Sequence, residues 1–292
     1  MILSLRQLYN LNMADWVIIA ILGGLASNLG NFLFRYLLKE GDDSTAYAWF
    51  HEAFRFIFFL IVTIFSFHLV FEIKGLLTLI GLGFIELTAA FFLMKMHSYS
   101  HLSISTIISR TRLIWVPIIA YILFKETLKT PEYIGIAVLF IGLSIATSPK
   151  RLLADKGQIY AYFSAFTIAM VNIFLKLAAS YANTSVIMVF MSLPSVILFP
   201  KLMKGAKRRI TASLKINLPL KITTGLVNAL SMYLLAKAIE LGPVSKVTSL
   251  YQSMMIASVI AGIIFLNERQ DVKKKLIGSL ITLVGAILLT NK

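Results

Sequence analysis

The chain has 292 residues, of which 58% are hydrophobic and only 14% charged, and its mean hydropathy is +0.84. Soluble domains carry about a quarter of their residues as charges, so this composition excludes a soluble protein and indicates an integral membrane protein. The net charge of +15 lies mostly in short connections between apolar segments, where basic residues set orientation and meet anionic lipid, and we therefore expect a lipid bilayer and no nucleic acid as partner.

Ten apolar segments follow one another along the chain, most of them close to the ~20 residues that a membrane-spanning helix needs. The predicted spans are residues 16–38, 48–71, 76–96, 103–124, 133–147, 158–179, 186–202, 218–241, 244–266 and 276–289. The longest connection, residues 203–217, is basic and is expected to lie on the membrane surface. The predicted fold is therefore an all-α integral membrane protein with about ten transmembrane helices.

The second half of the chain repeats the first at an offset of 141 to 143 residues. The matching positions are Asn31 and Asn172, Arg35 and Lys176, Glu126 and Glu268, Gly135 and Gly278, and Gly142 and Gly285. Polar and glycine positions match in order, which hydrophobicity alone does not require. A joint near Pro149 divides the chain into residues 1–149 and 150–292, with five spans in each half. An odd number of spans reverses the second copy in the bilayer, so we predict two inverted five-helix repeats, which are typical of secondary transporters.

A set of residues in each half resembles the EamA-type family of the drug/metabolite transporter superfamily. In the first half these are Pro117 within a helix, Glu126 after it, and Gly135 and Gly142 one heptad apart in the next helix. In the second half they are the stretch 238–243, Asn267-Glu268, Gly278 and Gly285. The resemblance implies a ten-helix bundle that transports small metabolites, with no enzymatic step and no cofactor.

Polar residues deep in the spans are candidates for substrate binding, because charge in the middle of a membrane is costly and is kept for function. Glu86 and Arg110 lie deepest, and the repeat aligns them with Asn228 and Gln252. Symmetry-related polar groups on both sides of the repeat interface are what a central binding cavity needs. The candidate substrate-binding residues are Asn31, Glu86, Arg110, Asn172, Asn228, Tyr251 and Gln252.

Glu86 and Arg110 allow two interpretations. They can form a buried ion pair that joins the third and fourth helices. Alternatively, Glu86 without a close cation would bind a proton and serve as the proton-coupling residue, because desolvation favours the neutral carboxyl group. Arg110 would then bind a carboxylate or phosphate group, which suggests an anionic or zwitterionic metabolite.

Other polar residues are expected to be structural. Arg35 and Lys176 lie near helix ends, from which long side chains reach the interface. His51, Glu52 and Arg55 are interpreted as an interfacial network or an outer gate. The four repeated glycines are expected to allow close helix packing.

No metal site or catalytic set is predicted. His97 and His101 have the spacing of a metal site but lie in a predicted turn with no carboxylate close in sequence. The chain has no cysteine, which excludes thiolate ligands. Catalysis needs a converging base and nucleophile, which the sequence does not offer, so the protein is predicted not to be an enzyme.

The sequence therefore predicts a secondary transporter of the plasma (inner) membrane that exports an amino acid or related metabolite by alternating access, as a monomer or homodimer. The alternative is a membrane enzyme or flippase that acts on a lipid-linked anionic substrate held by the basic connection. The basic residues of alternate connections place both termini outside, whereas members of the family usually have both in the cytoplasm. The sequence leaves the orientation and the choice of substrate open.

Overall fold

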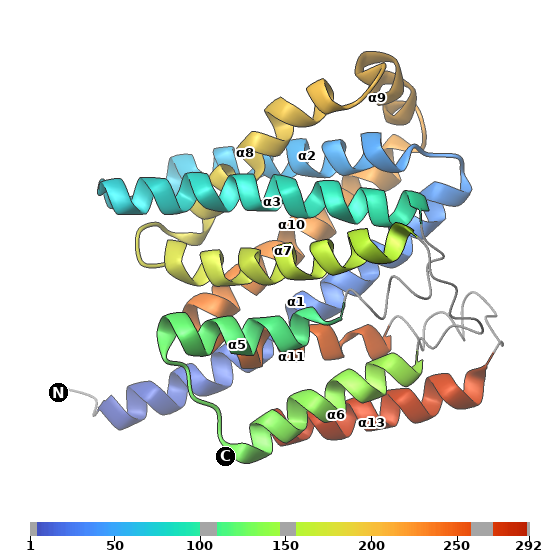
Figure 1. The fold of residues 1–292 in the computed structure, drawn as a ribbon. Helices are drawn as coiled ribbons and strands as arrows, with labels where there is room; N and C mark the ends of the chain where they lie inside the picture. The colour runs from blue at the N-terminus through green and yellow to red at the C-terminus, as the bar shows by residue number, and fades with distance from the viewer. Residues whose placement is uncertain (1–4, 100–109, 147–155, 258–270, 291–292) are drawn as a thin grey trace.

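The computed structural model describes residues 5–99, 110–146, 156–257 and 271–290, and these residues form a bundle of α-helices with no β-strand among them (Figure 1). The helices are α1 Leu5–Lys39, α2 Ser44–Phe65, α3 Ile73–Tyr99, α5 Arg112–Phe124, α6 Thr130–Ala146, α7 Lys156–Ala178, α8 Thr184–Leu202, α9 Ala206–Leu214, α10 Leu218–Leu241, α11 Val244–Ser253 and α13 Val272–Thr290. Six of the described helices are long and apolar enough to cross a membrane: α1, α2, α3, α7, α8 and α10. The prediction of an all-α, multi-pass membrane protein is confirmed at this level.

Polar side chains at the helix ends decide where several spans begin. Asp43 caps α2 by accepting hydrogen bonds from the backbone N–H groups of Thr45 and Ala46 at 2.9 and 3.0 Å. An N-cap carboxylate satisfies amide groups that have no partner inside the helix. As a result α2 begins at Ser44, one turn before the predicted start at residue 48. Asn183 and Asn217 cap α8 and α10 in the same way.

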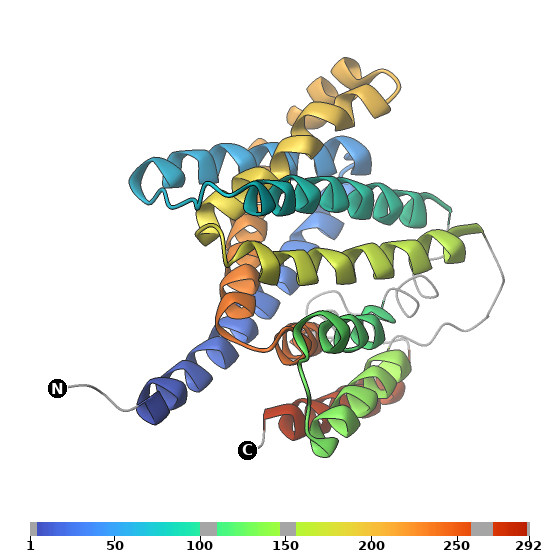
Figure 2. The same ribbon diagram turned by 60° about the vertical axis from the view of Figure 1, so that its left-hand side comes forward.

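Helices α6 and α13 pack along the glycine seam, which we define as Gly135, Gly142, Gly278 and Gly285. A Cβ atom placed on Gly135 would lie 2.9 Å from the carbonyl oxygen of Gly285, and one on Gly142 would lie 2.8 Å from that of Gly278. The predicted role of these glycines in close packing is confirmed. Because the earlier residue of α6 meets the later residue of α13, the two helices run antiparallel. They form one edge of the bundle, and α9 lies at the opposite edge in both views (Figures 1 and 2).

Helices α2 and α8 also run antiparallel. The indole Nε1 of Trp49, near the start of α2, donates to the carbonyl oxygen of Val196 at 3.1 Å. At the other end of the pair, the Ser66 and Ser185 hydroxyl groups lie 3.2 Å apart. Beyond this point the α2–α3 and α7–α8 connections pair through a single antiparallel bridge between Leu69 and Ala182.

Two further pairs of long helices pack together, and each pair takes one helix from each half of the chain. Helix α1 packs against α10, where a Cβ on Gly23 would lie 3.1 Å from Leu234 and one on Gly30 would lie 3.6 Å from Val227. Helix α3 packs against α7, the counterpart of α1, and Gly81 faces the Phe174 ring there. The main apolar core draws buried residues from helices of both halves, so the halves are intertwined rather than separate domains.

Candidate substrate site

A cluster of polar side chains lies midway along α2, α3 and α8, where these three helices meet. We call Glu52, Arg55, Glu86 and Ser192 the central cluster. Glu86 is the central residue of α3, and Arg55 and Ser192 lie near the middle of α2 and α8. The predicted depth of Glu86 is consistent with this position, but the interpretation of Arg55 as an interfacial residue is wrong because α2 begins earlier than expected.

The Arg55 guanidinium is the centre of this cluster. It donates to Glu52 Oε2 at 2.5 Å, to Glu86 Oε1 at 3.2 Å and, through Nε, to the Ser192 hydroxyl at 2.7 Å. The Arg55, Glu52 and Glu86 side chains are 3%, 10% and 14% exposed. Buried polar groups are expected to be paired in this way. The predicted alternative of a Glu86–Arg110 ion pair is corrected, because the cation at Glu86 is Arg55.

Arg110 lies in a different part of the bundle. It precedes α5 and is only 2% exposed, and its guanidinium donates to Met255 Sδ, just after α11, at 2.9 Å. Glu86 and Arg110, which the sequence predicted to lie deepest in the spans, therefore belong to different helix contacts.

A second polar group surrounds α11. Asn172 on α7 donates weakly to the Thr248 hydroxyl at 3.4 Å. The Ser231 hydroxyl on α10 donates to the Gly23 carbonyl oxygen at 2.9 Å and lies 2.7 Å from the Tyr251 hydroxyl. Gln252, the next residue after Tyr251, is buried. Three of the predicted site residues, Asn172, Tyr251 and Gln252, thus gather where α1, α7, α10 and α11 meet.

Asn31 and Asn228 occupy a separate position. They lie on α1 and α10, which pack against each other, directly after the neighbouring pair Gly30 and Val227. Asn31 is exposed and Asn228 half-buried. The predicted residues thus divide among four contacts between the halves, and their role in substrate binding stays a prediction.

Sequence reasoning missed Arg55, Glu52 and Ser192 as central residues. A signal was available in the sequence Asp42-Asp43-Ser44, because an aspartate before a helix is a typical N-cap. Starting α2 there would have moved Arg55 from the first turns to the middle of the helix.

The α10–α11 junction is held by two charged side chains of opposite sign. Lys176 donates to the carbonyl oxygens of Ile239, Glu240 and Gly242 at 2.7, 3.1 and 3.0 Å. Glu126, from the first half, accepts the backbone N–H groups of the first two α11 residues at 3.0 and 3.1 Å. A cation at a helix C-terminus and an anion at an N-terminus both suit the helix dipole. The predicted snorkelling of Lys176 is therefore wrong, and the side chain of Arg35 lies outside the described part of the chain, as does Glu268.

The connection between α8 and α10 contains α9, which is joined to the α1–α2 connection by an ion pair. Arg209 donates to both carboxylate oxygens of Asp43 at 2.7 and 2.8 Å. Lys221 on α10 pairs with Asp42 at 2.8 Å, and both side chains are fully buried. The hydrogen bonds from Arg209 hold the pKa of the Asp43 carboxyl below its ordinary value, although partial burial acts in the opposite direction. The basic connection is thus packed against the α1–α2 connection through Arg209.

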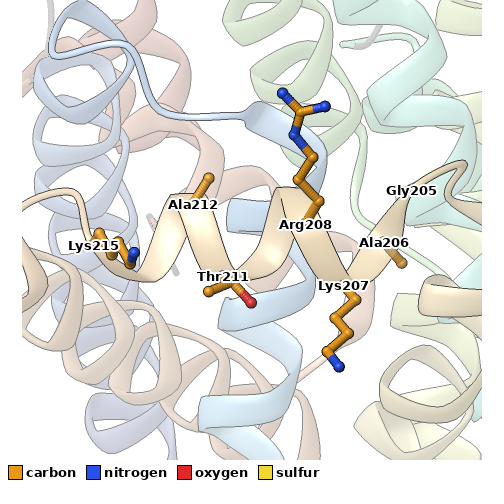
Figure 3. A pocket seen from close by; sticks show the side chains of 7 residues that line it. All are labelled: Gly205, Ala206, Lys207, Arg208, Thr211, Ala212 and Lys215. Atoms are coloured by element: carbon orange, nitrogen blue, oxygen red, sulfur yellow. The ribbon is translucent and has the colours of Figure 1, made fainter.

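The outer side of α9 lines a hollow of about 800 Å³. Its basic side chains are Lys207, Arg208 and Lys215, and in Figure 3 Lys207 and Arg208 extend to opposite sides of the helix. Arg209, which was expected to help hold an anionic lipid-linked substrate, is engaged with Asp43. A second hollow of about 560 Å³ lies between α5 and α6 and is lined by apolar and aromatic residues.

A metal site is not found among the described residues, in which no group of three or more His, Asp or Glu side chains could hold an ion. The His97 side chain and His101 lie outside the described part of the chain.

Comparison with known families decides the class of protein. The model of the EamA-like transporter family matches residues 14–148 and again residues 155–291. The chain belongs to the EamA-like transporter family. The two matches also confirm the resemblance found in the sequence and show that the family's unit occurs twice in this protein.

Membership of this family identifies a membrane transporter of small solutes and agrees with the prediction that the protein is not an enzyme. No curated protein matches the chain. A solved structure described only as "Crystal structure of protein" has a TM-score of 0.70 and 11% sequence identity, and the match covers 94% of both chains. At this identity the similarity concerns the fold alone.

Proposed function

We propose that this EamA-like protein is a secondary transporter of ten transmembrane helices in two inverted five-helix repeats, residues 1–149 and 150–292. The direction of the helices carries this proposal. Matching helices of the two halves, α2 with α8 and α6 with α13, run antiparallel. An internal copy whose helices all point the other way is the arrangement from which alternating access is built.

The proposed substrate is a small metabolite, an amino acid or a related compound, which the protein exports across the plasma membrane as a monomer or homodimer. Its site is formed by Asn31, Glu86, Arg110, Asn172, Asn228, Tyr251 and Gln252. Each of these residues lies on or next to a helix that contacts the other half of the chain. Rocking of one half against the other would therefore change all four contact regions together, with Glu86 as the proton-coupling residue.

Counterflow in proteoliposomes tests this function. Purified protein is reconstituted with an unlabelled solute inside, and uptake of labelled amino acids, nucleobases or sugar phosphates is measured. We expect exchange of one class, and we expect it to fall strongly in Gln252→Ala and Asn172→Ala. A matched control is Gln158→Ala, at the start of α7 and away from the proposed site. Folded protein that exchanges no solute of any class would contradict the proposal.

A further inference from the structure

The central cluster has one more carboxylate than it has cations. Glu52 and Glu86 share the single guanidinium of Arg55, and the fourth member, Ser192, is neutral. An unmatched charge at the centre of a membrane is energetically costly. The cluster is neutral only when one of the two carboxylates carries a proton or another cation.

A proton fits this position better than a metal ion. A metal cation would need several oxygen ligands around it, but the guanidinium already occupies the position between the two carboxylates. Protonation needs no additional space, since it adds one O–H bond to a carboxylate oxygen and changes the formal charge of the cluster from −1 to 0.

A line of polar side chains leads from the α9 end of the bundle to this cluster. Asp43, Tyr47, His51 and Arg55 follow one another on α2 at intervals of four residues, which places them on one face of the helix. Asp43 is about one-third exposed, and the Tyr47 and His51 rings are in contact, with centroids 4.2 Å apart and planes tilted by 44°. The line therefore connects the surface with the interior.

His51 supplies an imidazole to this line, and its two ring nitrogens allow one to accept a proton while the other donates one. Its Nε2 atom is buried and has no hydrogen-bond partner among the described residues. The Ser195 hydroxyl on α8, one turn from Ser192, is also buried and has no hydrogen-bond partner among the described residues. Buried polar atoms without protein partners are normally satisfied by water, which is what a proton path between His51 and the cluster requires.

The other charged groups near His51 balance one another. Lys221 on α10 reaches this face of α2, with its ammonium 5.9 Å from the centre of the Phe50 ring. It is paired with Asp42 and hydrogen-bonded to Ser213 of α9. Arg209 of α9 is paired with Asp43. The excess negative charge therefore belongs to Glu52 and Glu86.

From this geometry we infer that Glu52 and Glu86 around Arg55 form a proton-binding site that is filled from the α9 end of the bundle through His51. The inference rests on the proposed function, because binding and release of this proton would couple solute movement to a pH gradient. It adds Glu52 and His51 to the proton-coupling residue expected from the sequence and assigns the side of the bundle from which the proton enters.

Infrared difference spectroscopy tests the site without any substrate. Reconstituted protein is moved from about pH 8 to about pH 6, well above the range in which exposed carboxyl groups titrate. We expect the carbonyl stretch of one protonated carboxyl group to appear in the wild-type protein and to be lost in Glu52→Gln and in Glu86→Gln. Glu72→Gln, an exposed residue before α3, is the matched control and should keep the band.

The two variants lie on different helices, so a folding defect in one leaves the other as a test. A band that persists in both folded variants would overturn the inference. This result would leave the proposed solute transport intact, since solute counterflow needs no pH gradient. A protein without counterflow would instead contradict the transporter, whatever the infrared spectrum shows.

The entry path has its own test. Proteoliposomes containing an identified substrate are exposed to a pH gradient of either direction. We expect His51→Asn to lose most of the gradient-driven uptake while counterflow at equal pH continues, whereas the matched control His68→Asn, in the exposed α2–α3 connection, keeps both. Unchanged gradient-driven uptake in His51→Asn would overturn the path through this residue.

Discussion

The glycine seam and the central cluster are both contacts between the halves of the chain, but they are built in opposite ways. The glycine seam uses the same residues from each half, because Gly135 and Gly142 correspond to Gly278 and Gly285. The central cluster takes its charges from the first half alone, and the second half contributes only the Ser192 hydroxyl. One contact has kept the symmetry of the duplication and the other has lost it.

The two contacts differ because the glycine seam serves helix packing, whereas the central cluster serves the pairing of charges. Close approach of two helices in lipid depends on small residues on both surfaces, so both copies must keep their glycines. A charged group needs a partner but not a copy of itself, and each extra charge in the membrane is costly. The second half could therefore lose ionisable residues at this depth, as the pair Glu86 and Asn228 illustrates.

The largest expected effect is the removal of the central cation. Arg55→Met would leave Glu52 and Glu86 buried without a partner, and breaking a buried ion pair from one side costs about 3 to 5 kcal/mol. We expect a large fall in the thermal unfolding midpoint in detergent. Arg209→Met also breaks an arginine–carboxylate pair, but this pair is about one-third exposed and should cost at most about 1 kcal/mol. Equal effects of the two changes would contradict the larger energetic cost that we assign to breaking the buried pairs of the central cluster.

The glycine seam is tested by adding one methyl group. In Gly278→Ala the new Cβ would lie 2.4 Å from the Ala146 backbone nitrogen and 2.6 Å from the Gly142 carbonyl oxygen, so α6 and α13 must separate. We expect a cost of about 1 to 3 kcal/mol in the free energy of unfolding. Gly30→Ala, whose Cβ meets only Val227 at 3.6 Å, is the matched control and should be neutral or slightly stabilising.

A smaller effect is expected at the α10–α11 junction. Glu126→Ala removes the acceptor for the first two N–H groups of α11, and the loss of such a cap costs about 1 kcal/mol. Glu126→Gln keeps a carbonyl acceptor but not the charge, and should lie between the wild type and Glu126→Ala. Hydrogen exchange at Val244 and Ser245 measures the change directly, and faster exchange limited to α11 is the expected result.

The smallest effect is a pH dependence at α9. Because the pKa of Asp43 is lowered in the folded protein, its ion pair with Arg209 contributes stability at pH values above the ordinary carboxyl pKa of about 4. This contribution is lost as the pH falls through the lowered value, and solvent screening limits it to less than about 1 kcal/mol. Asp43→Asn should therefore reduce the midpoint at pH 7 slightly and narrow the difference between pH 7 and pH 3. A larger difference between the midpoints at pH 7 and pH 3 in Asp43→Asn than in the wild type would contradict this prediction.

Much of the fold could be predicted because it depends on local sequence. The apolar length of each span is a property of consecutive residues, and the predicted span 218–241 coincides with α10. The glycine repeat predicted the seam, since only small residues allow backbones to approach. The starts of the helices were less accurate where a cap such as Asp43 extended α2 by a turn.

The candidate site was less predictable because it depends on which helices meet. Glu86 was recognised from its depth, but its partner Arg55 lies on another helix, and the sequence favoured Arg110 instead. Lys176 looked like an interfacial residue until the fold brought the end of α10 to it.

The sequence by itself determined the membrane environment, the duplication and the positions of polar residues within the spans. Hydrophobicity, spacing and repetition depend only on the order of residues along the chain. Only the tertiary structure decided which polar side chains share a partner. Pairing depends on helix rotation and on contacts between segments more than a hundred residues apart, such as Arg55 with Ser192 and Glu126 with the start of α11. These contacts form only when the two halves pack against each other, because a buried charged group is stable only with a hydrogen-bonding or oppositely charged partner close to it.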